Sequence, residues 1–144
     1  MLTPAREYNV TYVNERKKGG KQMAGKAIGE FSLKAITATY SPGPAGGVLN
    51  QVNWEGTATG FGAVFGTATY AGGPRGGTYS WCAEAFLDNG DALTGGGPGT
   101  FESVGKHRWR TKGYMDLSDG RRIAGEGEID LASRSWKGTI FEIG

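Results

Sequence analysis

A glutamate in the middle of an apolar run is the residue of this chain best suited to acid–base chemistry. Glu84 lies within residues 78–87, and strand alternation puts it on one face with Cys82 and Phe86. A carboxyl group enclosed by apolar groups has a raised pKa and can act as a general acid or base. The opposite orientation leaves Glu84 in water and turns the alternate side chains inward: Tyr79, Trp81, Ala83, Ala85 and Leu87. Alternation alone leaves both orientations open.

The single histidine is the second candidate for proton transfer. His107 begins the run 107–117 and shares a face with Trp109. An imidazole titrates near neutral pH and therefore suits acid–base catalysis, although a solvated histidine at a strand end is the commoner arrangement. The other face of this run is a basic stripe that is either solvated or binds an anionic ligand: Arg108, Arg110 and Lys112.

The residue types of this chain do not favour a metal-binding site or a phosphate-binding site. Zinc needs three or four Cys, His or carboxylate ligands, and this chain has one Cys and one His. The sequence has neither a P-loop nor a Gly-x-Ser-x-Gly motif. The only cysteine, Cys82, has no cation near it in the sequence and is expected to be a buried, inert thiol. We therefore expect a site without metal or cofactor.

Aromatic side chains are the remaining candidates for a binding site. The chain has four Trp, six Tyr and six Phe, and such rings either fill a core or line a pocket for a flat or apolar ligand. The rings open to both interpretations are Trp54, Phe61, Phe65, Tyr79, Trp81, Phe86, Trp109, Tyr114, Trp136 and Phe141. The residues expected to contact a substrate are Tyr79, Trp81, Cys82, Phe86, Trp109, Tyr114 and Trp54.

The elements that must position these residues are short strands. The chain has 27 glycines, and from about residue 30 onward they divide it into short runs that alternate apolar and polar residues. Interior glycine disfavours helices by about 1 kcal/mol relative to alanine, whereas alternating runs joined by tight turns favour antiparallel strands. We therefore predict an all-β fold, an antiparallel barrel of eight or nine strands with mostly meander topology.

The predicted strands follow one another with short connections. Residues 1–29 are expected to be partly irregular, with a first strand at 8–13 and a basic loop after it. The glycine-rich run 95–99 is expected to interrupt a strand, which resumes at residue 100. The other predicted strands are 30–40, 48–60, 63–70, 78–87, 107–117, 122–131 and 135–143.

Composition is typical of one domain spanning residues 1–144. The net charge of +2 gives no general attraction to nucleic acid or to anionic membranes, and the basic residues at 16–26 are expected to be solvated. A lone cysteine cannot form an intramolecular disulfide, the N-terminus lacks the apolar stretch of a secretory signal, and no apolar run approaches the ~20 residues that span a bilayer. We expect a soluble, cytoplasmic protein.

Two short sequence features carry a family resemblance. Gly-Thr-Ala-Thr at 56–59 recurs at 66–69, and Gly-Glu-Gly-Glu-Ile-Asp at 125–130 is followed by Trp-Lys-Gly-Thr at 136–139. With this rhythm, residues 29–144 resemble the small bacterial calycin-type β-barrels related to allene oxide cyclase. The rhythm is also similar to that of avidin and lipocalin barrels, but lipocalins usually carry a signal peptide and disulfides.

The resemblance implies a barrel lumen that holds a small apolar molecule, and an oligomer that is a homodimer or homotrimer. It implies a cofactor-free isomerase, cyclase or lyase acting on a hydrophobic or aromatic metabolite. Catalysis would then come from orientation in a dry pocket and from one acid or base, with Glu84 preferred and His107 second. The alternatives are a non-catalytic barrel that carries the same kind of ligand and a fully packed barrel with no pocket.

Overall fold

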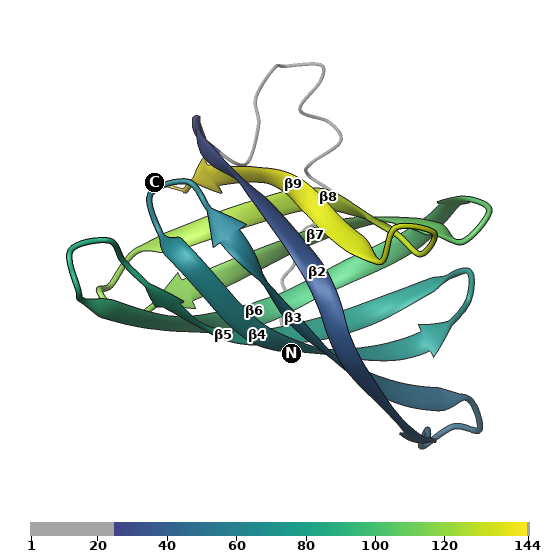
Figure 1. Cartoon of the computed structure of the whole chain (residues 1–144). Helices are drawn as coiled ribbons and strands as arrows, with labels where there is room; N and C mark the ends of the chain where they lie inside the picture. Colours follow the sequence, from purple (N-terminus) through teal and green to yellow (C-terminus); the bar gives the residue numbers. More distant parts are fainter. Residues whose placement is uncertain (1–24, 144) are drawn as a thin grey trace.

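Eight antiparallel strands and no helix make up the part of the chain that the structure, a computed structural model, describes, residues 25–143. The strands are β2 (Ala27–Pro42), β3 (Val48–Ala58), β4 (Gly62–Gly73), β5 (Gly76–Phe86), β6 (Ala92–Gly105), β7 (Arg108–Leu117), β8 (Arg122–Asp130) and β9 (Ser135–Glu142). Each strand pairs with its neighbour in the chain, and β9 pairs with β2 to close a barrel (Figure 1). The predicted antiparallel meander barrel is confirmed, and the strand predicted at 8–13 lies outside the described residues.

The first described strand begins earlier than the sequence indicates. Ala27 pairs with Phe141 of β9 and Gly29 pairs with Ile140, so residues 27–29 belong to β2 rather than to an irregular segment. These pairs belong to the seam that closes the barrel. Between residues 25 and 143 there is no helix with the length and apolar character needed to cross a membrane.

The glycine-rich run in β6 does not interrupt the strand, which corrects the prediction for residues 95–99. Gly95 pairs with Leu117 of β7 and Gly99 pairs with Gly113. A Cβ atom placed on Gly95 would lie 2.7 Å from the Leu117 side chain. These glycines therefore face the barrel interior and leave room for larger side chains, instead of ending the strand.

Aromatic rings fill the middle of the barrel around Trp136 of β9, which is only 4% exposed. Five rings surround it at centroid distances of 5.3–6.3 Å: Phe31, Trp54, Tyr70, Tyr79 and Trp81. All five contacts are tilted or edge-on, the arrangements that aromatic quadrupoles favour. They come from β2, β3, β4 and β5, so Trp136 joins its own side of the barrel to the opposite wall.

A smaller aliphatic cluster occupies one end of the barrel. Phe61, in the β3–β4 connection, packs with Leu117, Ile123 and Ile140. The guanidinium carbon of Arg121, in the β7–β8 connection, lies 5.3 Å from the centroid of the Phe61 ring. Because these two connections lie on opposite sides of the barrel, Phe61 and Arg121 meet across this end and cover it.

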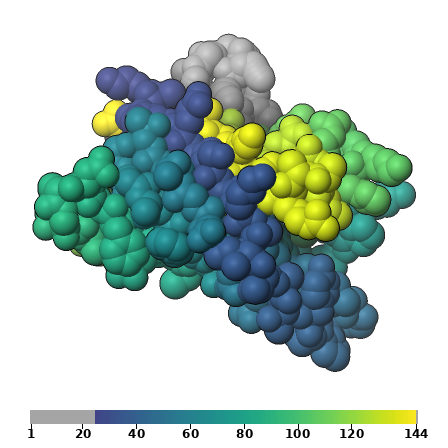
Figure 2. Space-filling view, in the orientation of Figure 1, coloured from purple at the N-terminus to yellow at the C-terminus, as the bar shows by residue number. Residues whose placement is uncertain are grey.

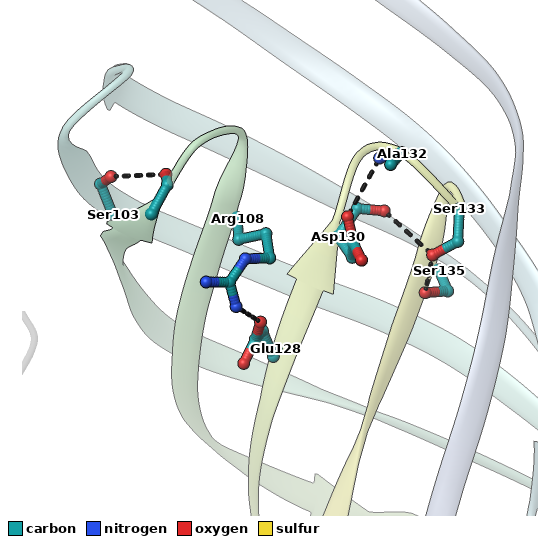
Figure 3. Close-up of polar contacts among 8 residues, drawn as sticks. Ser103, Arg108, Glu128, Asp130, Ala132, Ser133 and Ser135 are labelled. Carbon is teal, nitrogen blue, oxygen red and sulfur yellow. Dashed lines mark hydrogen bonds and ion pairs between the residues drawn. The ribbon is translucent and has the colours of Figure 1, made fainter.

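Ion pairs cover the outer face of β7 and β8. Arg108 Nη1 donates to Glu128 Oε2 at 2.8 Å (Figure 3). Arg110 pairs with Glu102 of β6 at 3.2 Å. At the end of β8, Asp130 accepts a hydrogen bond from the backbone N–H of Ala132 and so orders the turn into β9 (Figure 3). At these two arginines, the predicted basic stripe is therefore neutralised by neighbouring carboxylates.

The hairpin between β2 and β3 extends beyond the rest of the barrel. The β2–β3 register shifts between Ala35 and Thr37, which marks a bulge, and residues 36–42 beyond it are exposed. Figures 1 and 2 show this blue hairpin end projecting at the lower right, away from the other strands. The β2 side chains that pack in the interior, among them Phe31, Leu33 and Ala35, all precede residue 36.

Candidate functional site

An apolar cavity of about 110 Å³ lies inside the barrel. Its lining includes Trp136 of the aromatic layer and Phe61 of the covered end, so it occupies the space between them. All eight described strands contribute to its wall, because each turns alternate residues inward. Tyr79 and Thr111 are the polar side chains on the inward register among the lining residues.

The structure resolves the orientation of β5 and places Glu84 outside. Tyr79 is buried and Trp81 half-buried on the inner face, whereas Glu84 and Phe86 are exposed. The Phe86 ring lies 6.0 Å from Phe65, also on the outer face. Glu84 belongs to the strand segment that walls the cavity, but its side chain points to solvent. Its carboxylate therefore does not reach a molecule held inside.

The same alternation corrects the expectation for Cys82. The thiol is exposed on the outer face of β5, where its neighbours across the sheet are Thr67 and Gly96. The sequence predicts a buried, inert thiol, because Cys82 stands between two apolar residues and has no cation near it. Those flanking residues, Trp81 and Ala83, are the ones that face inward.

We expect Cys82 to react with a disulfide reagent such as dithionitrobenzoate in the native protein. The thiol is exposed, so one equivalent per chain should be released at a rate comparable with that of the unfolded chain. The absorbance of the released thiolate gives the rate, and the same reaction in guanidinium chloride is the reference. Protection of the thiol for hours in the folded protein would contradict the outward orientation of Cys82.

His107 does not lie on the inner face of a strand. It occupies the β6–β7 turn with a φ of 54° and is exposed. This end of the barrel is also the one where the Trp109 indole N–H donates to the carbonyl of Pro74 at 2.8 Å, in the β4–β5 turn. Antiparallel strands put the β4–β5 and β6–β7 turns at the end opposite Phe61. His107 and Trp109 are therefore remote from the cavity.

Of the residues predicted to contact a substrate, Tyr79 and Trp81 line the cavity with their side chains. Trp54 is 3% exposed and lies behind Trp136, with ring centroids 5.3 Å apart, so it supports the lining without belonging to it. Tyr114 belongs to the wall of the cavity, but the alternation of β7 puts its side chain on the outer register. Cys82 and Phe86 face outward.

Thr111 is the residue of this site that the sequence analysis missed. It is 1% exposed, lines the cavity, and its Oγ1 accepts a hydrogen bond of 3.0 Å from the indole N–H of Trp136. The signal that could have found it is the alternation in β7, where Thr111, Met115 and Leu117 share a face. A single threonine on an apolar strand face does not indicate a binding site unless its neighbours across the barrel are known.

Burial keeps the tyrosine hydroxyls of the interior neutral. Desolvation raises the pKa of Tyr79 well above its usual range. Burial also raises the pKa of Tyr70, and the nearby Tyr79 raises it further. The Trp54 side chain lowers the pKa of Tyr70 by a smaller amount. Both hydroxyls therefore stay protonated at physiological pH and serve as hydrogen-bonding groups.

Three further polar groups of the interior lie on β3 and β4, apart from the cavity lining. The buried Asn50 Oδ1, Trp54 Nε1 and Tyr70 hydroxyl have no hydrogen-bond partner within the described part of the chain. None of these three residues lines the cavity. They belong to β3 and β4, where Asn50 and Tyr70 are cross-strand neighbours. These groups therefore do not act on a molecule held between Trp136 and Phe61.

No group of three or more His, Cys, Asp or Glu side chains in residues 25–143 is arranged to hold a metal ion. Comparison of the chain with protein families, with curated proteins and with solved structures gave no match. What the cavity can do therefore follows from its size, its lining and its hydrogen-bonding groups.

Proposed function

We propose that this protein binds one small apolar molecule inside its barrel and leaves it chemically unchanged. The observation that supports the proposal is the apolar cavity of about 110 Å³ between Trp136 and Phe61. An engineered apolar protein cavity of about 150 Å³ stays dry and binds benzene, so a cavity of this order suits a compact ligand with about six non-hydrogen atoms. Trp81 and Trp136 offer ring surfaces for contact with it.

The lining favours binding over an isomerase, cyclase or lyase reaction. Such reactions generally need a side chain that transfers a proton at a pKa near the working pH. Glu84 and His107, the two expected candidates, are exposed outside the lumen. Among the lining side chains on the inward register, the hydroxyls of Tyr79 and Thr111 remain, and burial keeps the first of them protonated. The carrier alternative is therefore better supported than the enzyme.

We expect benzene to raise the melting temperature of the protein in a concentration-dependent way. A ligand that binds only the folded state stabilises it by about 2.7 kcal/mol when its concentration is one hundred times its Kd. Differential scanning calorimetry at increasing benzene concentrations measures this shift. Absence of any shift up to the solubility limit of benzene would contradict the proposal.

A matched pair of variants tests where benzene binds. Ala85 lines the cavity, whereas Ala63 is exposed on the outer face of β4. Ala85→Leu should fill the cavity and abolish the stabilisation by benzene, and Ala63→Leu should retain it. Equal responses of the two variants would place benzene outside the lumen and contradict the proposal.

A further inference from the structure

Thr111 presents a hydrogen-bond donor to the apolar cavity. A hydroxyl group donates one hydrogen bond and accepts two. Thr111 Oγ1 accepts from Trp136 Nε1 at 3.0 Å, and this is its one hydrogen bond among residues 25–143. The donor of Trp136 holds the hydroxyl oxygen in place, and the Thr111 proton has no acceptor in the described structure. Because Thr111 lines the cavity, that proton is available to a ligand.

Tyr79 brings a second hydroxyl to the same wall. Its ring lies over Gly99, and its hydroxyl oxygen reaches Gly113, where an added Cβ would come within 2.5 Å of it. Gly113 and Thr111 are two residues apart on β7 and so share its inner face. The Tyr79 hydroxyl makes no hydrogen bond within the described range. Two hydroxyl donors therefore lie along the same inner face of β7, at one side of the cavity.

The lining restricts the group that can meet these donors. No cationic side chain lines the cavity, so an anionic ligand would lose its hydration without gaining a counter-charge. A carbonyl oxygen is neutral, has two lone pairs, and brings no donor that would need an acceptor of its own. The rest of the ligand must be apolar and compact, because the other lining side chains on the inward register are apolar, and Glu84 and Thr94 of the wall are exposed on its outer side.

We propose, building on the binding function above, that the ligand is a small cyclic or aromatic carbonyl compound whose oxygen accepts hydrogen bonds from Thr111 and Tyr79. Thr111 and Tyr79 are then the residues that determine specificity, and the apolar lining contributes affinity without selecting the functional group. Trp136 positions Thr111 through its indole N–H.

The test uses two ligands of the same shape, cyclopentanone and methylenecyclopentane, which differ by an oxygen in place of a methylene group. Their Kd values are measured by calorimetric titration on the wild type, Thr111→Val and Tyr79→Phe. Each variant should weaken cyclopentanone binding about three- to tenfold, the effect of one neutral hydrogen bond, and leave methylenecyclopentane within about twofold. Tyr79→Phe leaves the Trp136–Thr111 bond untouched, and Thr111→Ser should keep the preference for cyclopentanone.

Different results separate this inference from the proposed function. If methylenecyclopentane binds but neither variant weakens cyclopentanone selectively, the carbonyl assignment is overturned and the binding function stands. If neither compound, nor benzene, binds the wild type, the binding function itself is overturned, and the carbonyl assignment falls with it.

Discussion

Trp136→Ala should lower the free energy of unfolding by about 3–5 kcal/mol, the usual cost of truncating a buried aromatic side chain. Trp136 is 4% exposed and its ring contacts five other rings from four strands. Its removal would enlarge the existing cavity and leave Thr111 without its donor. Single domains are stable by only about 5–15 kcal/mol, so this variant should be marginally folded at room temperature.

Urea unfolding followed by far-ultraviolet circular dichroism measures this loss without depending on tryptophan fluorescence. Trp109→Ala is the matched control, because Trp109 is only half-buried, is not among the five rings around Trp136, and donates its indole N–H to one turn carbonyl. Trp109→Ala should lower the free energy of unfolding by about 1–2 kcal/mol. If Trp109→Ala were as costly as Trp136→Ala, the central role of Trp136 in the core would be wrong.

The meander topology could be predicted because each strand pairs with its chain neighbour, and alternation and turn residues are local signals. The role of each individual glycine could not be predicted from the sequence. Gly90 has a φ of 98° and forms a turn after Asn89, a dipeptide that suits the positive φ of tight hairpin turns. Gly99 lies within β6 and makes space for the Tyr79 ring. The sequence marks both positions with the same residue, and the difference between them depends on a ring from another strand.

The candidate site was predicted only in part, for a related reason. Alternation divides β5 into two faces, but which face is inside depends on the volume that rings from other strands already occupy. Tyr79 and Trp81 meet Trp136 from β9, which turns Glu84 and Cys82 outward. Thr111 gains its importance from a hydrogen bond to a residue 25 positions away. Contacts across the barrel join residues that are distant in the sequence, so no local sequence pattern predicts them.

Gly99→Ala should destabilise the protein by about 1–3 kcal/mol, as expected when a methyl group is forced into a packed core. The new Cβ would collide with the Tyr79 ring, which is 8% exposed. The ring cannot easily turn away, because the Tyr70 and Trp136 rings lie 5.7 and 5.4 Å from it. Chemical denaturation of the variant measures the loss.

Gly73→Ala is the control for adding a methyl group to a strand glycine. A Cβ at Gly73 would have no atom within 4 Å, so this variant should lie within about 0.5 kcal/mol of the wild type. Repeating Gly99→Ala in a Tyr79→Ala background isolates the role of the ring, since residues in contact show coupling energies of about 0.5–3 kcal/mol. The cost of Gly99→Ala should fall close to zero there. An unchanged cost would mean that Gly99 serves the backbone of β6, and that the Tyr79 hydroxyl is not held in place by the space above this glycine.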